Sequence, residues 1–159
     1  MRTRKAIALL LLSISLVACT KESDSKTSNC LPTDTGYQMC VTPELLQQLT
    51  SEEMKAEDGT FQADVFNYGA ISATTIYYTD LTVKEKHILL TVFLFPEDKF
   101  DAAANPNEPP MFGQEVIREG GNVLSVAGPQ DSMFDPAMQD GKNITALYEA
   151  MYTAMTWVK

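Results

Sequence analysis

The sequence predicts an α+β fold, in which a single small domain combines an antiparallel sheet of about four to six strands with short amino-terminal helices and an amphipathic carboxyl-terminal helix packed on the sheet. Two segments with strand-like composition, 71–79 and 87–95, lie in the middle of the chain. A pair of glycines at 120–121 separates two further apolar segments, as in a β-hairpin. Apolar residues then recur at helical spacing over 143–158.

The first elements of the domain are predicted to be helical. Thr42 offers an N-cap hydroxyl, Pro43 suits the first helical position, and Glu44 places an acid in the first turn. The stretch 50–53 (Thr-Ser-Glu-Glu) then has the pattern of a capping box. We therefore expect two short helices, or one helix with a break, over 43–57.

The next segments are predicted to be mainly strands. Apolar and polar residues alternate over 61–65, and a turn is expected over 67–70. The segment 71–79 is rich in Thr, Ile and Tyr, which suit a half-buried sheet surface. The near-continuous apolar segment 87–95 is expected to be a central strand covered on both faces. A long irregular segment is expected over 96–110.

The hairpin has a predicted register. Glycines at 120–121 permit the positive φ angles of a type I′ turn. This turn places Ile117 opposite Leu124 and also sets Arg118 opposite Val123. The final helix follows a second loop, and one apolar stripe of that helix is expected to lie on the sheet.

The first nineteen residues carry the most specific signal in the chain. A short basic head precedes an apolar segment over 6–17, which is shorter than the roughly twenty residues that a membrane-spanning helix needs. Ala18 and Cys19 follow, and the whole arrangement is typical of a secretory signal peptide. The ending Leu-Val-Ala-Cys resembles the lipobox of bacterial lipoproteins. The resemblance implies cleavage before Cys19 and a thioether-linked diacylglycerol on it, so membrane lipid is an expected partner.

Three parts are expected along the chain: a cleaved signal peptide over 1–18, a lipidated cysteine with a flexible tether over 19–29, and a globular domain over 30–159. Beyond its cysteine the tether has no apolar side chain, so it cannot bury surface. Neither Thr20 nor Lys21 is the aspartate that retains lipoproteins in the inner membrane. The resemblance therefore implies the outer membrane, facing the periplasm, with the outer face of a Gram-positive cell membrane as the alternative.

The remaining cysteines form an even pair. With Cys19 taken by lipid, Cys30 and Cys40 are left in an oxidising compartment, where disulfides form. A bridge between them would close a loop of about ten residues and fasten the end of the tether to the domain. Their spacing lacks the Cys-x-x-Cys pattern of redox-active pairs, so a structural role is expected.

The expected mature chain is acidic. Removing 1–18 leaves nine basic and twenty-one acidic residues, a formal charge of −12. Such a surface repels nucleic acid, so no nucleic-acid partner is expected, and it attracts cationic proteins or divalent cations. The simplest role of this charge is to keep an envelope protein soluble.

The sequence shows no catalytic constellation. The single histidine, His87, has no serine or cysteine nucleophile marked for it and is expected to be a solvated residue at a strand end. Asp131, Asp135 and Asp140 offer oxygen ligands for Ca²⁺, but their spacing is not that of an EF-hand. We expect no catalytic residue, no cofactor and no metal site, and these three aspartates are the only candidates for a calcium site.

Loop methionines and aromatic residues make adaptable binding surfaces. Met-Phe pairs lie in two of the predicted loops, and one pair follows a segment rich in proline and asparagine. We expect these side chains either to close the core beneath their loops or to contact a partner. The candidate contact residues are Asn105, Pro109, Pro110, Met111, Phe112, Met133 and Phe134.

The sequence therefore predicts a lipid-anchored, non-catalytic envelope lipoprotein that acts as a binding or accessory domain for another envelope protein. The lipobox, the tether, the single domain and the acidic charge support this function. One alternative is a lipoprotein that binds a small molecule or calcium, with a pocket between the final helix and the sheet. Another is an inhibitor of a cationic hydrolase such as lysozyme, although the short motifs of known lysozyme-inhibitor lipoproteins are missing from the sequence.

Overall fold

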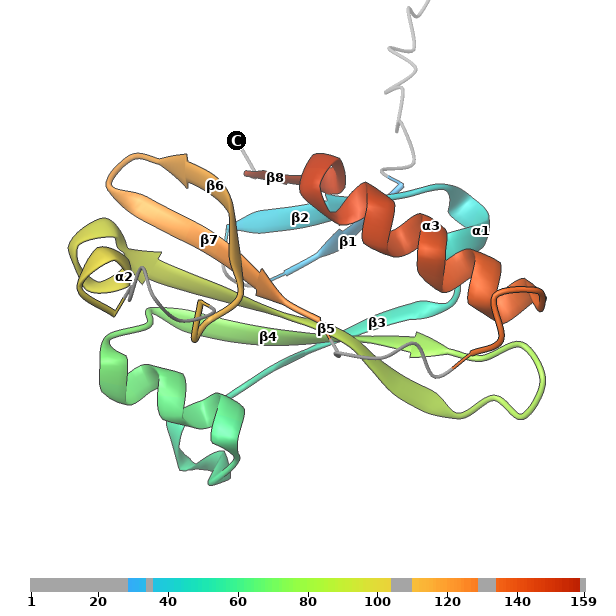
Figure 1. Ribbon diagram of the computed structural model, residues 1–159, viewed down its shortest axis with the longest axis horizontal. Coiled ribbons are helices and arrows are strands. Elements are labelled where there is room, and N and C mark those ends of the chain that lie inside the picture. The colour runs from blue at the N-terminus through green and yellow to red at the C-terminus, as the bar shows by residue number, and fades with distance from the viewer. Residues whose placement is uncertain (1–28, 34–35, 104–109, 129–133, 158–159) are drawn as a thin grey trace, which may run out of the picture.

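The computed structural model describes residues 29–33, 36–103, 110–128 and 134–157, and within them the predicted α+β fold is confirmed (Figure 1). An antiparallel sheet of five strands, here called the large sheet, forms the middle layer. Its strands, in spatial order, are β3 (Leu49–Glu53), β4 (Ser72–Thr79), β5 (Lys86–Pro96), β7 (Asn122–Ala127) and β6 (Gln114–Glu119).

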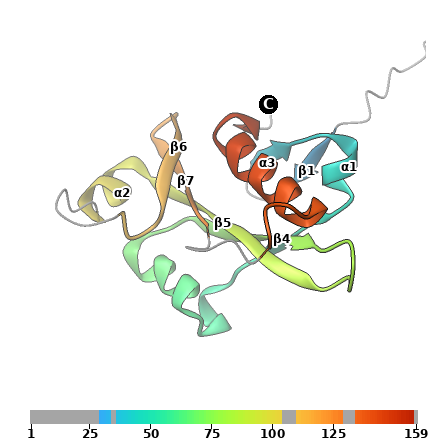
Figure 2. The same cartoon turned by 45° about the vertical axis from the view of Figure 1, so that its right-hand side comes forward.

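Two sets of elements cover the faces of the large sheet. One face, which we call the α3 face, lies under the helix α3 and under a three-stranded small sheet in the order β1-β2-β8 (Figure 1). The opposite face, which we call the η2 face, carries two 3₁₀ helices, and the view in Figure 2 agrees with this arrangement. These elements and the remaining helices are β1 (Cys30–Pro32), β2 (Tyr37–Cys40), β8 (Met155–Trp157), α1 (Pro43–Leu46), α2 (Glu97–Ala103), α3 (Gln139–Ala154), η1 (Ala56–Asp58) and η2 (Phe61–Tyr68).

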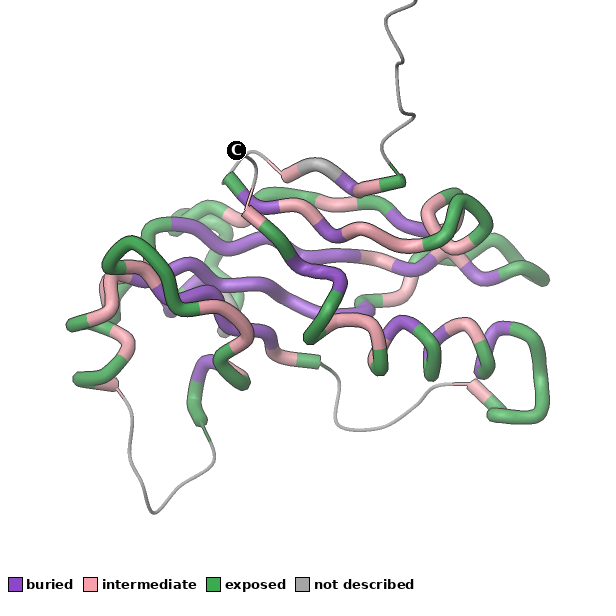
Figure 3. The backbone as a smooth tube through the Cα atoms, turned by 90° about the horizontal axis from the view of Figure 1, so that it is seen from above, coloured by how far each residue is buried: buried purple, intermediate pink, exposed green. Residues whose placement is uncertain are grey.

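Two hydrophobic clusters lie on opposite faces of the large sheet, and β5 supplies both because successive side chains of a strand alternate. Leu90, Val92 and Leu94 belong to the cluster on the α3 face. Phe93 and Phe95 belong to the cluster on the η2 face, against which α2 also packs. Buried residues accordingly follow the middle strands of the sheet (Figure 3). The predicted central strand is confirmed, with both faces covered over most of its length.

The predicted helices over 43–57 are wrong beyond the first turn. α1 ends at Leu46, and 49–53 forms the edge strand β3 rather than a capped second helix. β3 pairs antiparallel with β4 along its whole length. This pairing satisfies backbone groups of β4 that would otherwise lack partners, and the tertiary contact outweighs the local helix signal.

The alternating segment 61–65 is the start of η2 and not a strand. Thr60 caps this helix, since its side-chain oxygen accepts a hydrogen bond from the N–H of Ala63 at 3.2 Å. Ala63 and Val65 are buried. The alternation of apolar and polar residues in the sequence therefore reflects two buried side chains of a helix and not one face of a strand. η2 ends at the predicted turn, where Gly69 adopts a left-handed φ of +92°.

The β6–β7 hairpin is confirmed in its predicted register. Ile117 lies opposite Leu124 and Arg118 lies opposite Val123. The glycines at 120–121 have φ angles of +63° and +79°, which a type I′ turn requires. Local turn chemistry therefore determines this part of the sheet.

The ends of two other predicted elements differ from the structure. The last helix begins at Gln139 and ends at Ala154, because the residues that follow form β8 and pair with β2. The segment 96–110, predicted to be irregular, contains α2. Its residues 104–109 lie outside the described part of the chain.

The amino-terminal end of the domain is crosslinked. Cys30 and Cys40 form a disulfide and lie directly opposite one another in the β1–β2 pair. The predicted signal peptide, Cys19 and all but the last residue of the tether lie outside the described residues. Among the helices of the described part, none is both long and apolar enough to cross a bilayer.

Candidate functional site

A pocket of about 620 Å³ opens on the η2 face of the large sheet. η2 contributes Val65 and Tyr68, β5 contributes Phe93, and the loop before β6 contributes Met111 and Phe112. The end of β7 completes the lining, which is mostly apolar. This pocket lies on the face of the large sheet opposite α3, whereas the ligand-binding alternative drawn from the sequence places its pocket between the final helix and the sheet.

A β-bulge in β5 determines which side chains reach the pocket. The register with β4 shifts between Ile76 and Tyr77, which leaves Leu89 as an extra residue in β5. Regular alternation would place Ile88 beside Leu90 on the α3 face. With the bulge, Ile88 lies on the η2 face and lines the pocket. The bulge therefore turns one large apolar side chain away from the core and toward the pocket.

Phe112 is held in place at the centre of the pocket's aromatic side chains. Its ring centroid lies 5.1 Å from that of Tyr68 and 6.4 Å from that of Phe93. Its backbone carbonyl accepts a hydrogen bond from Ser125 Oγ at 2.8 Å. The next residue, Gly113, has a φ of +77°, and a Cβ there would lie 2.1 Å from a backbone oxygen of β7. The pocket wall is thus anchored to the sheet by a contact that only glycine permits.

Large apolar side chains of the pocket remain in contact with solvent. Tyr68 is 49% exposed, Ile88 is 47% exposed and Met111 is 54% exposed. They come from three segments that are distant in sequence and line one pocket. Contiguous exposed apolar surface of this kind marks interaction sites more often than a scattered apolar residue does.

The pocket contains few polar side chains. Thr91 lines it and is 4% exposed, and its hydroxyl makes no hydrogen bond to any residue that the structure describes. Asp64 and Asn67 of η2 also line the pocket and are exposed. Asp64 has no ion-pair partner within the described ranges. The site thus offers apolar walls with a small number of separate polar groups.

The predicted contact residues are divided between the two faces of the sheet. Met111 and Phe112 line the pocket, and Pro110 is exposed just before them. Phe134 lies on the α3 face, where its ring centroid is 6.0 Å from that of Tyr78. The structure does not bring Phe134 to the pocket. The predicted contact residues outside the described part of the chain are Asn105, Pro109 and Met133.

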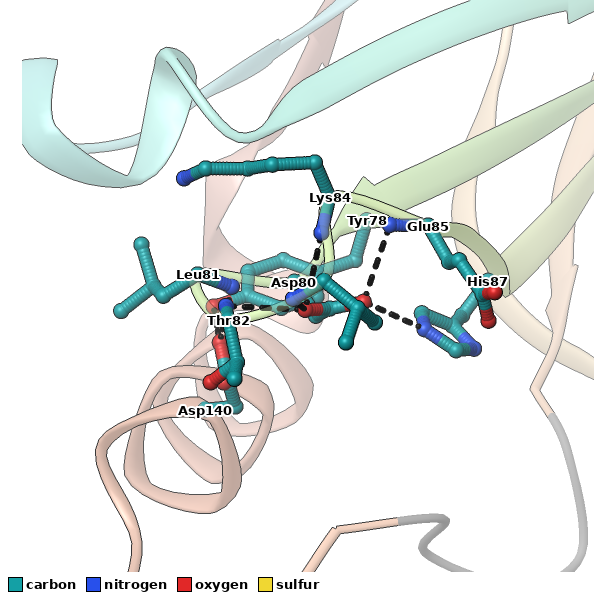
Figure 4. Close-up of polar contacts among 9 residues, drawn as sticks. Tyr78, Asp80, Leu81, Thr82, Lys84, Glu85, His87 and Asp140 are labelled. Carbon is teal, nitrogen blue, oxygen red and sulfur yellow. Dashed lines mark hydrogen bonds and ion pairs between the residues drawn. The ribbon is translucent and has the colours of Figure 1, made fainter.

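A second group of polar side chains lies in the turn between β4 and β5 (Figure 4). The Asp80 carboxylate is buried and lies 3.0 Å from His87 Nε2. Burial raises the pKa of Asp80, but hydrogen bonds from His87 and from backbone N–H groups lower it further, to well below its usual value. The backbone donors, at 2.6 to 3.2 Å, are Thr82, Val83, Lys84 and Glu85. This carboxylate therefore holds the turn together and has no free side for a ligand.

His87 lies at the end of β5, as the sequence predicts, but its side chain is only partly exposed. Its side chain is 22% exposed, and its ring centroid lies 5.0 Å from that of Phe134. Besides the contact with Asp80, its ring makes no hydrogen bond to a described serine, threonine or cysteine. The His87–Asp80 pair thus orders the turn.

Asp140 lies in the first turn of α3, near the positive end of the helix. Its Oδ1 accepts hydrogen bonds from Tyr78 Oη at 2.7 Å and from the N–H of Leu81 at 3.0 Å. Tyr78 Oη in turn accepts a hydrogen bond from Asn143 at 2.9 Å. Burial and the hydrogen bond to Asp140 raise the pKa of Tyr78 to about 12. Asp140 is therefore engaged in joining α3 to the large sheet.

Of the three aspartates considered for calcium, the structure describes Asp135 and Asp140, and each accepts hydrogen bonds from the protein. Asp135 accepts a hydrogen bond from the N–H of Ala137 at 2.8 Å and so stabilises its own turn. Asp131 lies outside the described residues. Within the described ranges, no group of three His, Cys, Asp or Glu side chains is arranged to hold a metal ion.

Arg118 links α2 to the edge strand β6. Its guanidinium lies 2.8 Å from Glu97 and 2.9 Å from Asp101, both of α2, and 2.7 Å from Glu115 of β6. Hydrogen bonds from Arg118 lower the pKa of Asp101 and of Glu115. Because these groups are largely exposed, the cluster positions α2 more than it stabilises the domain.

The sequence pointed to only part of this site. Met111 and Phe112 were predicted from their loop, whereas Ile88 was not, because a bulge leaves no local signal. Asp80 opens a polar turn, and an aspartate there is a known turn signal that could have marked it. No protein-family model, curated protein or solved structure matches this chain.

Proposed function

We propose that this chain is a lipid-anchored, non-catalytic lipoprotein of a bacterial envelope that binds an apolar ligand in the η2-face pocket. The single observation that carries the binding function is the pocket itself, with its anchored aromatic wall and its exposed apolar side chains. The lipobox-like ending at Cys19 supports the anchor and the location, with the outer membrane facing the periplasm as the first expectation.

The size and lining of the pocket support a small ligand. Its volume of about 620 Å³ lies within the range of roughly 300–1,000 Å³ that is usual for ligand sites. Ser125 and Gly113 fix the wall at Phe112, so little ordering is needed when a ligand enters. A preformed apolar cavity with few polar groups is the ordinary form of such a site.

The competing proposal is that the chain binds another protein rather than a small ligand. A standard protein interface buries about 800 Å² on each partner, which exceeds a single pocket of this kind. The exposed side chains of Tyr68 and Met111 would serve a partner that inserts an apolar side chain. A ligand assay separates the two functions, because a small apolar probe fills a ligand site without help from any protein surface.

The binding function is tested with the neutral probe N-phenyl-1-naphthylamine, whose fluorescence rises in apolar surroundings. The protein used is the chain from residue 19 with Cys19→Ser, which contains every element that the structure describes. Ile88→Asp should weaken probe binding by about tenfold or more, because it replaces an apolar pocket contact with a charge.

Ile71→Asp is the matched control. Ile71 is 55% exposed, begins the segment that leads into β4 and does not line the pocket. Both variants should unfold at similar urea concentrations, and only Ile88→Asp should lose the probe. Two results would contradict the ligand-binding function: the unsubstituted protein does not bind the probe, or both variants bind it equally. Either result would favour a protein partner.

The anchor is tested separately in the host envelope. Cys19→Ser in the full chain should leave an uncleaved precursor without acyl chains, seen as a shift in mobility and as loss of labelling by a radioactive fatty acid. A variant still processed to an acylated product of unchanged mobility would contradict the lipoprotein assignment.

A further inference from the structure

We infer that the ligand of the η2-face pocket is an amphiphile with an apolar body and one ammonium group. This inference rests on the proposed binding function and specifies the chemistry of its ligand. Three polar features of the pocket carry it: an unpaired carboxylate, an exposed aromatic ring and a threonine hydroxyl that has no hydrogen-bond partner among the described residues.

The described lining of the pocket carries negative charge only. Asp64 is the only charged side chain among the described lining residues, which include no lysine, arginine or histidine. Its carboxylate has no ion-pair partner within the described part of the chain. A ligand carboxylate would therefore meet a like charge and no counter-charge, whereas an ammonium group would meet an unpaired acceptor.

Tyr68 adds a second contact for a cation. It lies four residues beyond Asp64 in η2, lines the same pocket and is 49% exposed. The face of an aromatic ring attracts ammonium groups, and the attraction grows when the group is partly desolvated. A carboxylate and a ring on one short helix thus favour the same head group.

Thr91 argues against a pure hydrocarbon as the ligand. Its side chain lines the pocket and is 4% exposed, and its hydroxyl finds no hydrogen-bond partner among the described residues. Filling the pocket with hydrocarbon would deprive this hydroxyl of water and leave it unsatisfied. A ligand that carries a polar group can satisfy it, while Phe93 and Phe112 contact the apolar body.

The test displaces N-phenyl-1-naphthylamine from the chain described above with ligands that share a body and differ in the head. Decylamine, decanol and decanoate form one series, and tryptamine with indole-3-propionate forms another. We expect each amine to bind about fivefold or more tightly than its carboxylate counterpart, with decanol between the two ends of its series. Tighter binding of the decyl series would identify the apolar body of the ligand as an alkyl chain. Tighter binding of the indole series would identify it as an aromatic ring.

Asp64→Asn should remove the preference. The ratio of amine to carboxylate affinity should fall to within about twofold of one, while decanol binding stays unchanged. Glu149→Gln is the matched control, because it removes one negative charge from an exposed position on α3, outside the pocket. It should leave the ratio as it is.

The outcomes separate the two proposals. If the probe binds and is lost in Ile88→Asp but the carboxylates compete as well as the amines, the head-group inference is overturned and the binding function stands. The same holds if Asp64→Asn leaves the ratio unchanged or if no ligand of either series displaces the probe. Failure of the probe itself to bind overturns the binding function and the inference with it.

Discussion

The two faces of the large sheet share their strands and differ in how fully they are covered. On the α3 face, Leu90, Leu124 and Leu147 are completely buried. On the η2 face, Ile88 and Tyr68 remain about half exposed beside the pocket. The difference shows that one strand can contribute to a packed core on one side and to an open pocket on the other.

The covering elements explain the difference. α3 has 16 residues and is about 24 Å long, and the small sheet extends its cover. η2 has 8 residues and, as a 3₁₀ helix, is about 16 Å long. The pocket opens where this shorter cover is incomplete and where the bulge of β5 adds Ile88.

The largest effect is expected from a cavity on the α3 face. Leu147→Ala should lower the free energy of unfolding by about 2–5 kcal/mol in urea denaturation, because it removes packing from a fully buried position. Probe affinity at the pocket should not change. Val83→Ala, at an exposed turn position, is the control and should change stability by less than about 0.5 kcal/mol. A loss of probe binding in Leu147→Ala would show that the faces are not independent.

The next effect is expected at the turn that closes the α3 face. Asp80→Asn should lower Tm by about 5–10 °C, because the backbone N–H groups of the turn lose a charged acceptor that is itself buried. Asp98→Asn, at an exposed position of α2, is the control and should leave Tm nearly unchanged. Equal Tm values for the two variants would contradict the role of Asp80 in the turn.

The loss of stability at acidic pH should depend on the Asp80 carboxylate. The pKa of Asp80 is lowered in the folded protein, so its contribution is present above the unfolded pKa of about 4 and is lost as pH falls toward the folded-state value. Urea titrations at a series of pH values should show a steeper loss below about pH 4 in the unsubstituted protein than in Asp80→Asn. Parallel curves would rule out this source of acid sensitivity.

A smaller effect is expected at the link between α3 and the large sheet. Tyr78→Phe should cost about 1–2 kcal/mol at neutral pH, because Asp140 loses a donor. The pKa of Tyr78 is raised to about 12, so its contribution is present below the unfolded value of about 10 and is lost between these two pH values. The stability of Tyr78→Phe should therefore fall less steeply than that of the unsubstituted protein over this range.

The smallest effect is expected on the η2 side, at the link between α2 and β6. Arg118→Gln should lower Tm by less than about 3 °C, because its ion pairs are exposed to solvent. The difference should shrink further at high salt. A loss as large as that of Asp80→Asn would mean that the η2 side contributes as much to stability as the closing turn of the α3 face.

The sequence predicted those parts of the fold that local chemistry determines. The glycines at 120–121 were sufficient to predict the register of a whole hairpin, because the turn type dictates it. The segment 49–53 was mispredicted as helical, since its partner β4 is distant in the chain and its local pattern favours a capped helix. The site followed the same rule: Met111 and Phe112 were visible as loop residues, whereas Ile88 depends on a register shift between two strands.

The disulfide also decides how mechanical tension would pass through the domain. A pull on the segment before Cys30 would, without the crosslink, unzip β1 from β2 one hydrogen bond at a time. The bond to Cys40 instead carries the load directly to the end of β2 and leaves residues 31–39 outside the loaded path. Tension then enters the rest of the domain at Val41, so the pairing of β2 with the carboxyl-terminal strand β8 lies outside the loaded path.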